Sequence, residues 1–426
     1  MYVLYTMNKI HTNTAIDNHA LLTLYNLFVE ADKYVANKAR DNCFKYTHTN
    51  INMVSQIPRP HMFSSHFFPK HILEYIDETA LHKIQYICKI KGRTVNIYFV
   101  LNDYMYDTLK TQNIHFIDNY IRMMYMWIYT LSAFSNTTCS KTLSVYVYLT
   151  PFQKVLPDNQ LITIGTEHVN TAYTTHCKMN NEIVIYRQEE WFKVFVHETF
   201  HSFGLDFANM ANTHTINKEM KRLFNVNTDF LLFESYCEFW ARTINCMMYT
   251  YFQLEHKGNI KYENFEKTFR KHMDKESRHS LLQGLKILNF LGLDYKTVNK
   301  DYTHTTNVKK TDKNTTAVTT CNYLYKENTA IFSYYIITSL LINNYCEFMY
   351  WCLCNNTNDN KFLEFKKTPG NINSYIEFID LSRRDKNILK LVANIEKSFV
   401  DNHDNMDRNL RMTTLDIHNT IQHNTT

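Results

Sequence analysis

The stretch from Val194 to Phe203 carries an H-E-x-x-H motif in a run with no other charged side chain, and it constrains the fold more than any other feature. On an α-helix, residues four apart lie on one face, so His197 and His201 can point at the same ion. Two neutral imidazoles are half of a tetrahedral zinc site. Glu198 lies one step round the helix, where it can reach a zinc-bound water without occupying the metal. The motif therefore predicts a buried, metal-binding helix.

A zinc site needs a third protein ligand, and the residues directly after the motif do not supply the familiar one. The pattern H-E-x-x-H-x-x-G-x-x-H of the metzincins requires a histidine at position 207, where this chain has Phe207. Asp206 lies one residue too early and is a reserve candidate. Without a third ligand, the motif reduces to a buried helix whose two histidines are hydrogen-bonded core residues.

A better candidate for the third ligand lies in residues 229–242, a largely apolar segment without Gly or Pro that is typical of a buried helix. Glu234 and Glu238 are four apart and share a face, where two like charges repel unless a cation offsets them. We therefore interpret Glu234 as the third ligand. Glu238 is expected to accept the ring N–H of a ligand histidine and so to fix its tautomer. The alternative is a solvated acidic face on an amphipathic helix.

An H-E-x-x-H helix followed by a helix with E-x-x-x-D/E resembles the layout of the gluzincin metallopeptidases, and the resemblance covers residues 180–245. It implies a role for each matching residue: zinc ligands at His197, His201 and Glu234, the general base at Glu198, and an acidic partner of a ligand histidine at Glu238. Two positions depart from the family pattern. The acidic partner is more often Asp, and the ligand Glu commonly follows an Asn, where this chain has Phe233.

A longer set of segments looks like metallopeptidases encoded by giant nucleocytoplasmic DNA viruses. These segments are residues 182–187, 189–194, 197–207 and 234–240. The abundance of Asn, Ile, Lys and Tyr, with only 7 Gly and 6 Pro, is typical of an AT-rich coding genome and agrees with that resemblance. The resemblance implies a viral source, and with it the host cytoplasm or the virion as the location. It does not indicate a substrate.

These residues together predict a zinc-dependent peptidase. Zinc lowers the pKa of its bound water to about 7. Glu198 then takes the proton during attack on the carbonyl and passes it to the leaving amine. The oxyanion needs a further hydrogen-bond donor. The candidates are Tyr236, His214, Arg242, Tyr334 and Tyr335, of which Tyr236 is the weakest because its spacing from the ligand Glu turns it away from the metal.

Two other functions share the same motif. The first is a non-peptidase zinc hydrolase of the amidase or deformylase type, with a small closed pocket. The second is a virion or interaction protein that keeps a structural zinc. A protein of the second kind has no use for Glu198 and should tolerate Glu198→Gln, whereas a hydrolase should lose about a hundredfold or more of its rate.

Length and composition set wider limits. A chain of 426 residues can bury a large core with two or three subdomains, and a net charge of +5 is too small to indicate a nucleic-acid partner. The 10 cysteines are scattered without a C-x-x-C pair, which favours free thiols in a reducing compartment. Cys177 is a remote candidate for a further zinc ligand. The sequence says nothing about the oligomeric state.

No segment of the sequence is typical of export or of membrane insertion. Residues 1–20 lack a basic stretch followed by an apolar run, so we expect no signal peptide. The most hydrophobic segment, residues 331–354, contains Asn343, Asn344 and Glu347, which are costly in lipid. We interpret it as a buried helix and expect a soluble protein.

The expected fold class is α+β: a zincin-like domain, in which a mixed β-sheet lies over the H-E-x-x-H helix, with a mainly helical C-terminal part. Strands are expected at 82–90, 94–101, 142–149 and 182–187, the first two as a hairpin, and helices at 21–35, 114–134, 229–252, 263–290 and 327–350. The expected divisions are a mixed or helical segment at 1–70, the zincin-like domain at 71–300, a linker at 301–320, a helical subdomain at 321–400 and a polar tail at 401–426.

The strand at 182–187 has a further expected role. In a zincin domain the last strand before the active-site helix is commonly the edge of the sheet. An extended peptide can add to such an edge by main-chain hydrogen bonds, which favours a peptide over a sugar or nucleotide substrate. The alternative is a central strand without contact to substrate.

Overall fold

The computed structural model describes most of the chain. The described ranges are residues 18–61, 68–111, 115–210, 213–300, 324–357, 361–401 and 407–416. The linker expected at 301–320 and the last part of the tail, 417–426, lie outside them.

The described residues form one mixed sheet and a larger number of helices, as the α+β class requires. The strands are β1 Tyr46–Asn50, β2 His82–Ile90, β3 Arg93–Leu101, β4 Thr142–Thr150, β5 Ala172–Thr174 and β6 Asn180–Arg187. The helices before the motif are α2 Asn18–Arg40, η1 Val54–Gln56, α3 Lys70–Thr79, α4 Asp103–Thr111, α5 His115–Leu131 and α6 Thr166–Val169. From the motif onward they are α7 Trp191–Ser202, α8 Thr213–Leu223, α9 Leu232–His256, α10 Tyr262–Phe290, α11 Tyr295–Val298, η3 Phe332–Ile337, α13 Thr338–Asn343, α14 Tyr345–Asn355, α15 Pro369–Ser382 and α16 Lys386–Asp401.

The sheet has the strand order β1-β2-β3-β4-β6-β5. Strands β1, β2 and β3 are antiparallel neighbours, β3–β4 and β4–β6 are parallel, and β5 returns antiparallel to β6. The expected hairpin is confirmed as β2 and β3. Its two-residue turn places Lys91 and Gly92 at φ of 47° and 78°, the left-handed conformations that such a turn requires.

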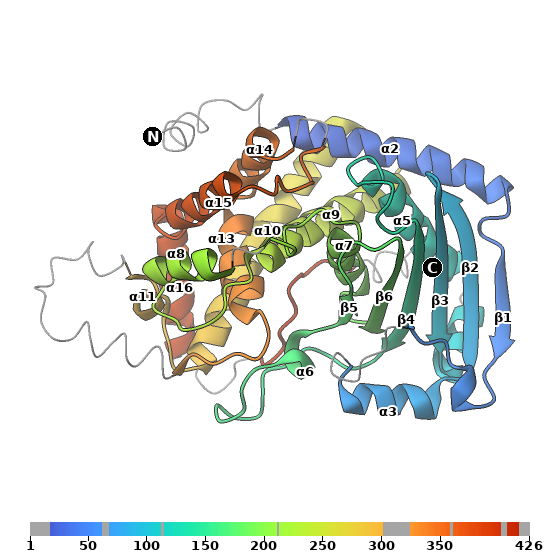
Figure 1. Ribbon diagram of the computed structural model, residues 1–426, viewed down its shortest axis with the longest axis horizontal. Coiled ribbons are helices and arrows are strands. Elements are labelled where there is room, and N and C mark those ends of the chain that lie inside the picture. Colours follow the sequence, from blue (N-terminus) through green and yellow to red (C-terminus); the bar gives the residue numbers. More distant parts are fainter. Residues whose placement is uncertain are drawn as a thin grey trace, which may run out of the picture.

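Helices cover both faces of the sheet. One face packs on α3, where Ile72 and Ile76 join a small apolar cluster with Tyr146 and Tyr186 of the sheet. The opposite face contributes to the main core together with α5 and α7. Helix α7 lies directly against β5 and β6 and, on its other side, against α9 (Figure 1). It is therefore enclosed by other elements, and every one of its residues except His201 is buried.

The helical half of the molecule lies beyond α7 and is built on the two longest helices after it, α9 and α10. Helix α10 packs on α9, α13 and α16, and α2 runs from this half across to α5 beside the sheet (Figure 1). The single large apolar core includes residues from α2, from the sheet and from the C-terminal helices. Residues 407–416 also belong to this body, since Leu410 and Met412 are buried in it.

The segment from 327 to 350 is not the single long helix that its composition predicts. It contains the π-helical turns of η3, continues as α13 and stops at Asn344, whose φ and ψ of −119° and 39° end the helix before α14 begins. The side-chain amides of Asn343 and Asn344 donate to the carbonyls of Ser339 and Leu340, one turn back. Asn side chains that bond the backbone in this way compete with helix continuation.

The prediction that residues 182–187 form the edge strand of the sheet is also wrong. Strand β6 contains residues 182–187, but it lies between β4 and β5 and is an internal strand. The short strand β5 forms the edge, with Ala172 opposite Ile185 and Thr174 opposite Ile183. Three residues are too few to show the alternation that predicts a strand.

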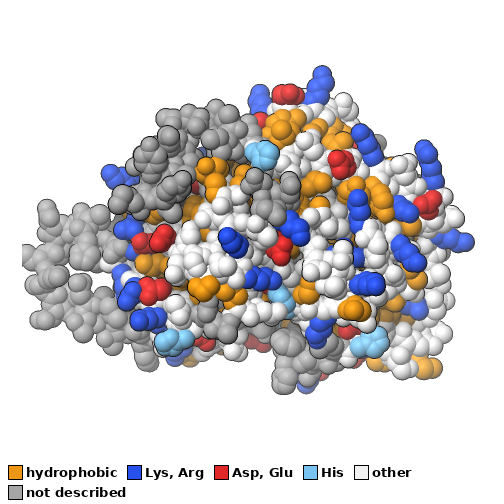
Figure 2. All heavy atoms as spheres, turned by 45° about the horizontal axis from the view of Figure 1, so that its top comes forward, with side chains coloured by type: hydrophobic (Ala, Val, Ile, Leu, Met, Phe, Trp, Pro, Cys, Tyr) orange, Lys and Arg blue, Asp and Glu red, His pale blue; other side chains and the backbone are white. Residues whose placement is uncertain are grey.

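The surface agrees with the modest net charge. On the face that Figure 2 shows, Lys and Arg side chains are spread out, with acidic and apolar side chains among them. Among the described residues, no helix combines the length and the apolar composition that a membrane span needs.

Candidate metal centre

Helix α7 is held at both ends by features that fix the direction of its histidines. Before it, Glu190 takes a left-handed conformation, with φ of 59°, and turns the chain from β6 into the helix. After it, Gly204 has φ of +72°, and a Cβ atom there would lie 3.1 Å from Cβ of Cys177 and 3.3 Å from Sγ of Cys139. Only glycine fits that turn without strain.

Cys139 and Cys177 form a disulfide that lies against this turn. The expectation of free thiols throughout is therefore wrong for this pair, while the other cysteines described are free. The backbone N–H of Cys177 donates to the carbonyl of His201, and the hydroxyl of Ser140 donates to the carbonyl of Ser202. The disulfide and its neighbours thus hold the last turn of α7. Cys177 is not a metal ligand.

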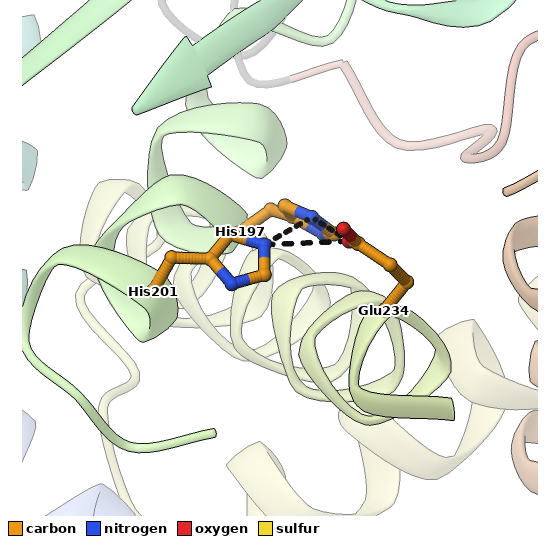
Figure 3. Close-up of side chains that lie close together, drawn as sticks. All are labelled: His197, His201 and Glu234. Carbon is orange, nitrogen blue, oxygen red and sulfur yellow. Dashed lines mark hydrogen bonds and ion pairs between the residues drawn. The ribbon is translucent and has the colours of Figure 1, made fainter. Parts of the chain in front are cut away.

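His197, His201 and Glu234 point toward one another across the contact between α7 and α9 (Figure 3). Nε2 of His197 lies 3.2 Å from Nε2 of His201 and 3.1 Å from Oε2 of Glu234, and the remaining side of the triangle is 3.3 Å. These three residues therefore form a group that could hold a metal ion.

The distances between the three atoms of this triangle can be compared with those between the ligands of a tetrahedral zinc ion. Zinc binds imidazole nitrogen and carboxylate oxygen at about 2.0–2.2 Å in a tetrahedron, so two ligand atoms lie about 3.3–3.6 Å apart. The observed separations fall at or just below that range, and a shift of a few tenths of an ångström brings all three atoms into it. One imidazole pair with one carboxylate is also a donor set that zinc accepts. The three residues fit the ion.

Burial and charge explain why these groups lie together. Burial by itself raises the pKa of Glu234, but the neighbouring histidines lower it to about 2. Burial lowers the pKa of both histidines, yet their neighbours outweigh it and the pKa of each is raised. These neighbours are Glu234 and Glu238 for His197, and Cys237, Glu234 and Asp206 for His201. Without a metal, the cluster therefore favours an ionised carboxylate and holds protons on the imidazoles. A divalent cation can replace those protons.

Glu198 lies beside the triangle without being part of it. Its side chain is buried, and burial raises the pKa of its carboxyl. Within the described part of the chain its carboxylate accepts no hydrogen bond from a side chain or from the backbone. It lines a small cavity together with His197 and Tyr334. Such a carboxylate is free to bind a water or a substrate group.

Glu238 contacts the other ring nitrogen of His197, with Oε2 at 3.1 Å from Nδ1. Lys193, one turn before His197, donates to both oxygens of Glu238 at 2.9 and 3.1 Å. Burial raises the pKa of Glu238, but Lys193 and His197 bring it down to about 2. Glu238 is thus an anion that accepts the Nδ1–H of His197 and leaves Nε2 facing Glu234.

His201 has a partner that the sequence offered only as a spare ligand. Its Nδ1 hydrogen-bonds Asp206, which is completely buried. The other oxygen of Asp206 lies 3.2 Å from Nδ1 of His176, and Sγ of Cys237 lies 3.7 Å from the same carboxylate. Asp206 therefore orients His201 from behind and takes no place in the triangle of His197, His201 and Glu234. The sequence feature that could have indicated this contact is Gly204, because the turn there folds residue 206 back toward α7.

Four of the five candidate oxyanion donors do not face the metal-binding triangle. Tyr236 donates to the carbonyl of Leu363, Tyr335 to that of Leu410, and Arg242 to Ser280, so each has a role elsewhere. His214 lies exposed on α8.

Tyr334 is the candidate that reaches the centre. Its ring is 5.9 Å from that of His197. Burial raises the pKa of Tyr334, as do the charges of Glu234, Glu198 and Glu238 and a hydrogen bond with Glu234. The π-helical turns of η3 place it there, and such turns are frequent at functional sites.

Comparison of the chain with protein-family models, with curated proteins and with solved structures finds no match. The geometry of the site is therefore the basis for any assignment of function.

Proposed function

We propose that this protein is a zinc-dependent peptidase of gluzincin type, and that its zinc is held by His197, His201 and Glu234. The observation that carries the proposal is the triangle of three metal-binding atoms, 3.1–3.3 Å apart, with a buried and unpaired carboxylate next to it. Resemblance to the metallopeptidases of giant DNA viruses, and with it a place in the host cytoplasm or the virion, is part of the same proposal.

Zinc at this position would supply Lewis-acid chemistry, by making a water nucleophilic near neutral pH and by polarising the scissile carbonyl. The protein's own residues divide the remaining work. Glu198 accepts the proton that the attacking water loses and delivers it to the leaving amine. Burial raises the pKa of Glu198, and a carboxylate with a raised pKa is a stronger base for this proton transfer.

Tyr334 is the donor that we assign to the developing oxyanion. A neutral hydroxyl is needed for this, and the acidic surroundings of Tyr334 keep its proton in place by raising its pKa. Lys193 and Asp206 act indirectly: Lys193 holds Glu238, the partner of His197, and Asp206 itself hydrogen-bonds the outer ring nitrogen of His201. The charge of each histidine, and the nitrogen it presents, are thereby fixed.

A peptide is the substrate class that the surroundings favour. Strand β5 is the edge of the sheet within the described residues, and Thr171 and Ala172 at its start line the cavity next to Glu198. An extended chain can pair with such an edge by main-chain hydrogen bonds. A small closed pocket, expected for a hydrolase of small amides, does not require a strand edge.

A purely structural zinc is the less favoured alternative. Structural sites are closed by four protein ligands. In this site three ligands converge, and Glu234 and His201 are still 14% and 13% exposed to solvent.

The test is metal analysis of the purified full-length chain beside His201→Ala and Glu234→Ala, followed by mass spectrometry of a peptide library. We expect about one zinc per chain in the wild type, a large reduction in both variants, and cleavage that Glu198→Gln abolishes while it retains zinc. Arg383→Lys is a suitable control, since Arg383 is buried and bonds Asn299 and Asp380, neither of which lines the cavity next to Glu198. Zinc without any cleavage would remove the peptidase assignment. Full zinc in Glu234→Ala would remove the ligand set.

A further inference from the structure

The disulfide between Cys139 and Cys177 lies close to the candidate metal centre, yet none of the zinc chemistry above uses it. It joins the chain just before β4 to the loop between β5 and β6, and it lies against the turn that follows α7. Cys139 is buried, at 5% exposed, whereas Cys177 is partly exposed. Cys177 is therefore the half of the bond that is open to a reductant in solution.

Two contacts connect this disulfide to His201, one of the three residues that could hold the metal. The backbone N–H of Cys177 donates to the carbonyl of His201 at 3.1 Å. His176, the residue before Cys177, places Nδ1 3.2 Å from Oδ1 of Asp206, whose other oxygen hydrogen-bonds the imidazole of His201. The loop that the disulfide anchors therefore touches the main chain of His201 directly and its ring through Asp206.

The turn at Gly204 packs directly on the disulfide. A Cβ atom at Gly204 would lie 3.1 Å from Cβ of Cys177 and 3.3 Å from Sγ of Cys139. When the bond is reduced, the two thiol groups cannot stay at bonding distance and must move apart. A closely packed interior does not absorb such a movement without displacing its neighbours. The turn at Gly204, three residues after His201, is one of these neighbours.

The strands on either side of the disulfide are held together without it. The backbone N–H of Ser140 donates to the carbonyl of Lys178 at 2.7 Å, and that of Thr142 donates to the carbonyl of Met179 at 3.0 Å. Strands β4 and β6 then continue as parallel neighbours. We therefore expect the sheet to survive reduction and the change to stay local, in the loop and the turn beside His201.

We propose that the Cys139–Cys177 disulfide is a redox switch on the metal centre. In the oxidised protein the loop and the turn hold His201 in place to bind zinc, and in the reduced protein the affinity for zinc falls. The proposal rests on the zinc site proposed above and adds the regulation of that site. It implies that zinc is bound more tightly in an oxidising compartment than in a reducing one.

The reductant is a dithiol, and the exchange balances in two steps. A thiolate of the dithiol attacks Sγ of Cys177, and the sulfur of Cys139 leaves as a thiolate and takes up a proton. The second thiol of the reductant then attacks the mixed disulfide and releases Cys177, which takes up the other proton. Two electrons and two protons pass to the protein, and the dithiol becomes a disulfide.

The test measures zinc affinity in the oxidised and the reduced full-length protein. A water-soluble phosphine reduces the disulfide and becomes a phosphine oxide, with its oxygen taken from water. It is removed without admitting air, and competition for zinc with a chromophoric chelator then gives the affinity. We expect reduction to lower the affinity by about 10–100-fold, the range seen when the groups that orient a ligand histidine are lost.

Hydrogen exchange of the zinc-free protein supplies a second readout that does not depend on the metal. The backbone N–H groups of Phe203, Gly204 and Leu205 donate to carbonyls in the last turns of α7. We expect them to exchange about tenfold faster, or more, after reduction, because the turn opens locally. Amides in the centre of β4 should exchange at the same rate in both forms.

Two variants show which thiols respond. Cys139→Ser combined with Cys177→Ser should have the zinc affinity of the reduced wild type and should not respond to the phosphine. Cys354→Ser is the matched control, because Cys354 is exposed and free, and it should keep the full response. If the double variant does not fold, the reduced wild-type protein, with its fold checked by circular dichroism, still decides the question.

Equal zinc affinity in the oxidised and reduced proteins would overturn the switch, even with a lower melting temperature, since the disulfide would then support the fold alone. A redox response that the double variant retains would also overturn it, because other thiols would be responsible. Faster exchange at the turn after reduction, in a protein that binds no zinc in either form, would support the coupling to His201 and remove the proposed zinc peptidase instead.

Discussion

Two buried polar clusters lie along the same helix, α9, and they differ in what completes them. Near the start of α9, Glu234 meets two imidazoles and no Lys or Arg. Two turns further on, Arg242 lies near Glu276 of α10, with NH2 and Oε2 3.6 Å apart, and both side chains are at most 2% exposed. Glu276 also accepts the backbone N–H of Thr414 at 2.7 Å. In the second, balanced cluster, the positive charge of Arg242 neutralises Glu276. In the first, the negative charge of Glu234 is neutralised only when the imidazoles bind protons or when the site binds a cation.

The difference teaches how a structural cluster can be told from a functional one in a single protein. Both clusters are largely buried, with side chains at most 14% exposed in the first and at most 2% exposed in the second, so charge rather than burial is what sets them apart. A carboxylate whose charge is cancelled by a fixed guanidinium has no affinity left for an ion, while one that faces two imidazole nitrogens retains it. Four predictions test this contrast.

The largest effect is expected at Tyr334. We predict that Tyr334→Phe lowers kcat by about 10²–10³, the range seen when one oxyanion donor is removed. Zinc content should stay the same. The matched control is Tyr335→Phe, one residue on, whose hydroxyl donates to the carbonyl of Leu410 and should affect stability alone. Steady-state kinetics decide it, and equal losses in the two variants would contradict the role of Tyr334.

The second prediction concerns the balanced cluster. Arg242→Met leaves Glu276 buried without a counter-charge and should lower the free energy of unfolding by about 3–5 kcal/mol. Urea denaturation measures this. Zinc content of the folded variant should match that of the wild type. Loss of zinc in proportion to loss of stability would mean that the two clusters are coupled.

The third prediction addresses the partner of His197. Glu238→Gln keeps the shape of the side chain but removes the charge that holds the Nδ1–H of His197, and we expect zinc affinity to fall about 10–100-fold. Competition with a chromophoric chelator gives the affinity. Glu276→Gln is the control in the balanced cluster and should leave zinc affinity unaltered, although it destabilises the fold.

The fourth and smallest effect is on pH dependence. Burial lowers the pKa of both ligand histidines, but Glu234 and Glu238 around His197, and Cys237, Glu234 and Asp206 around His201, raise it overall. Protons therefore compete with zinc once the pH falls below those raised values. The pKa of Glu234, at about 2, keeps that ligand ionised throughout. We expect zinc affinity to fall by about one to two decades per pH unit, since one or both imidazoles must lose a proton. A pH-independent affinity between pH 5 and 7 would show that histidine is not a ligand.

Many of the strands and helices could be predicted from the sequence. The hairpin of β2 and β3 follows from two alternating runs around Lys91 and Gly92. Strand β4 and the long helices α9 and α10 lie close to their expected bounds, because their apolar spacing is strong and local. Strand β5 was not predicted, because it is defined by its pairing with β6. The break at Asn344 was not predicted either, because the segment was read as one continuous helix and the bonds of Asn343 and Asn344 to the backbone one turn back were not foreseen.

For the site, the sequence by itself determined which side chains can bind a metal. His197 and His201 share a helical face because of the helix period, and Glu234 shares one with Glu238 for the same reason. Only the tertiary structure decided how the two helices face each other, and with it the role of every neighbour. Asp206 lies behind His201, Tyr334 reaches the centre from η3, and Cys139 pairs with Cys177. Periodicity is a local property of the backbone, whereas the contact of Tyr334 with His197 and the Cys139–Cys177 disulfide join residues far apart in the chain and are fixed only when the core packs. The contact of Asp206 with His201 depends on the turn at Gly204 that lies between them.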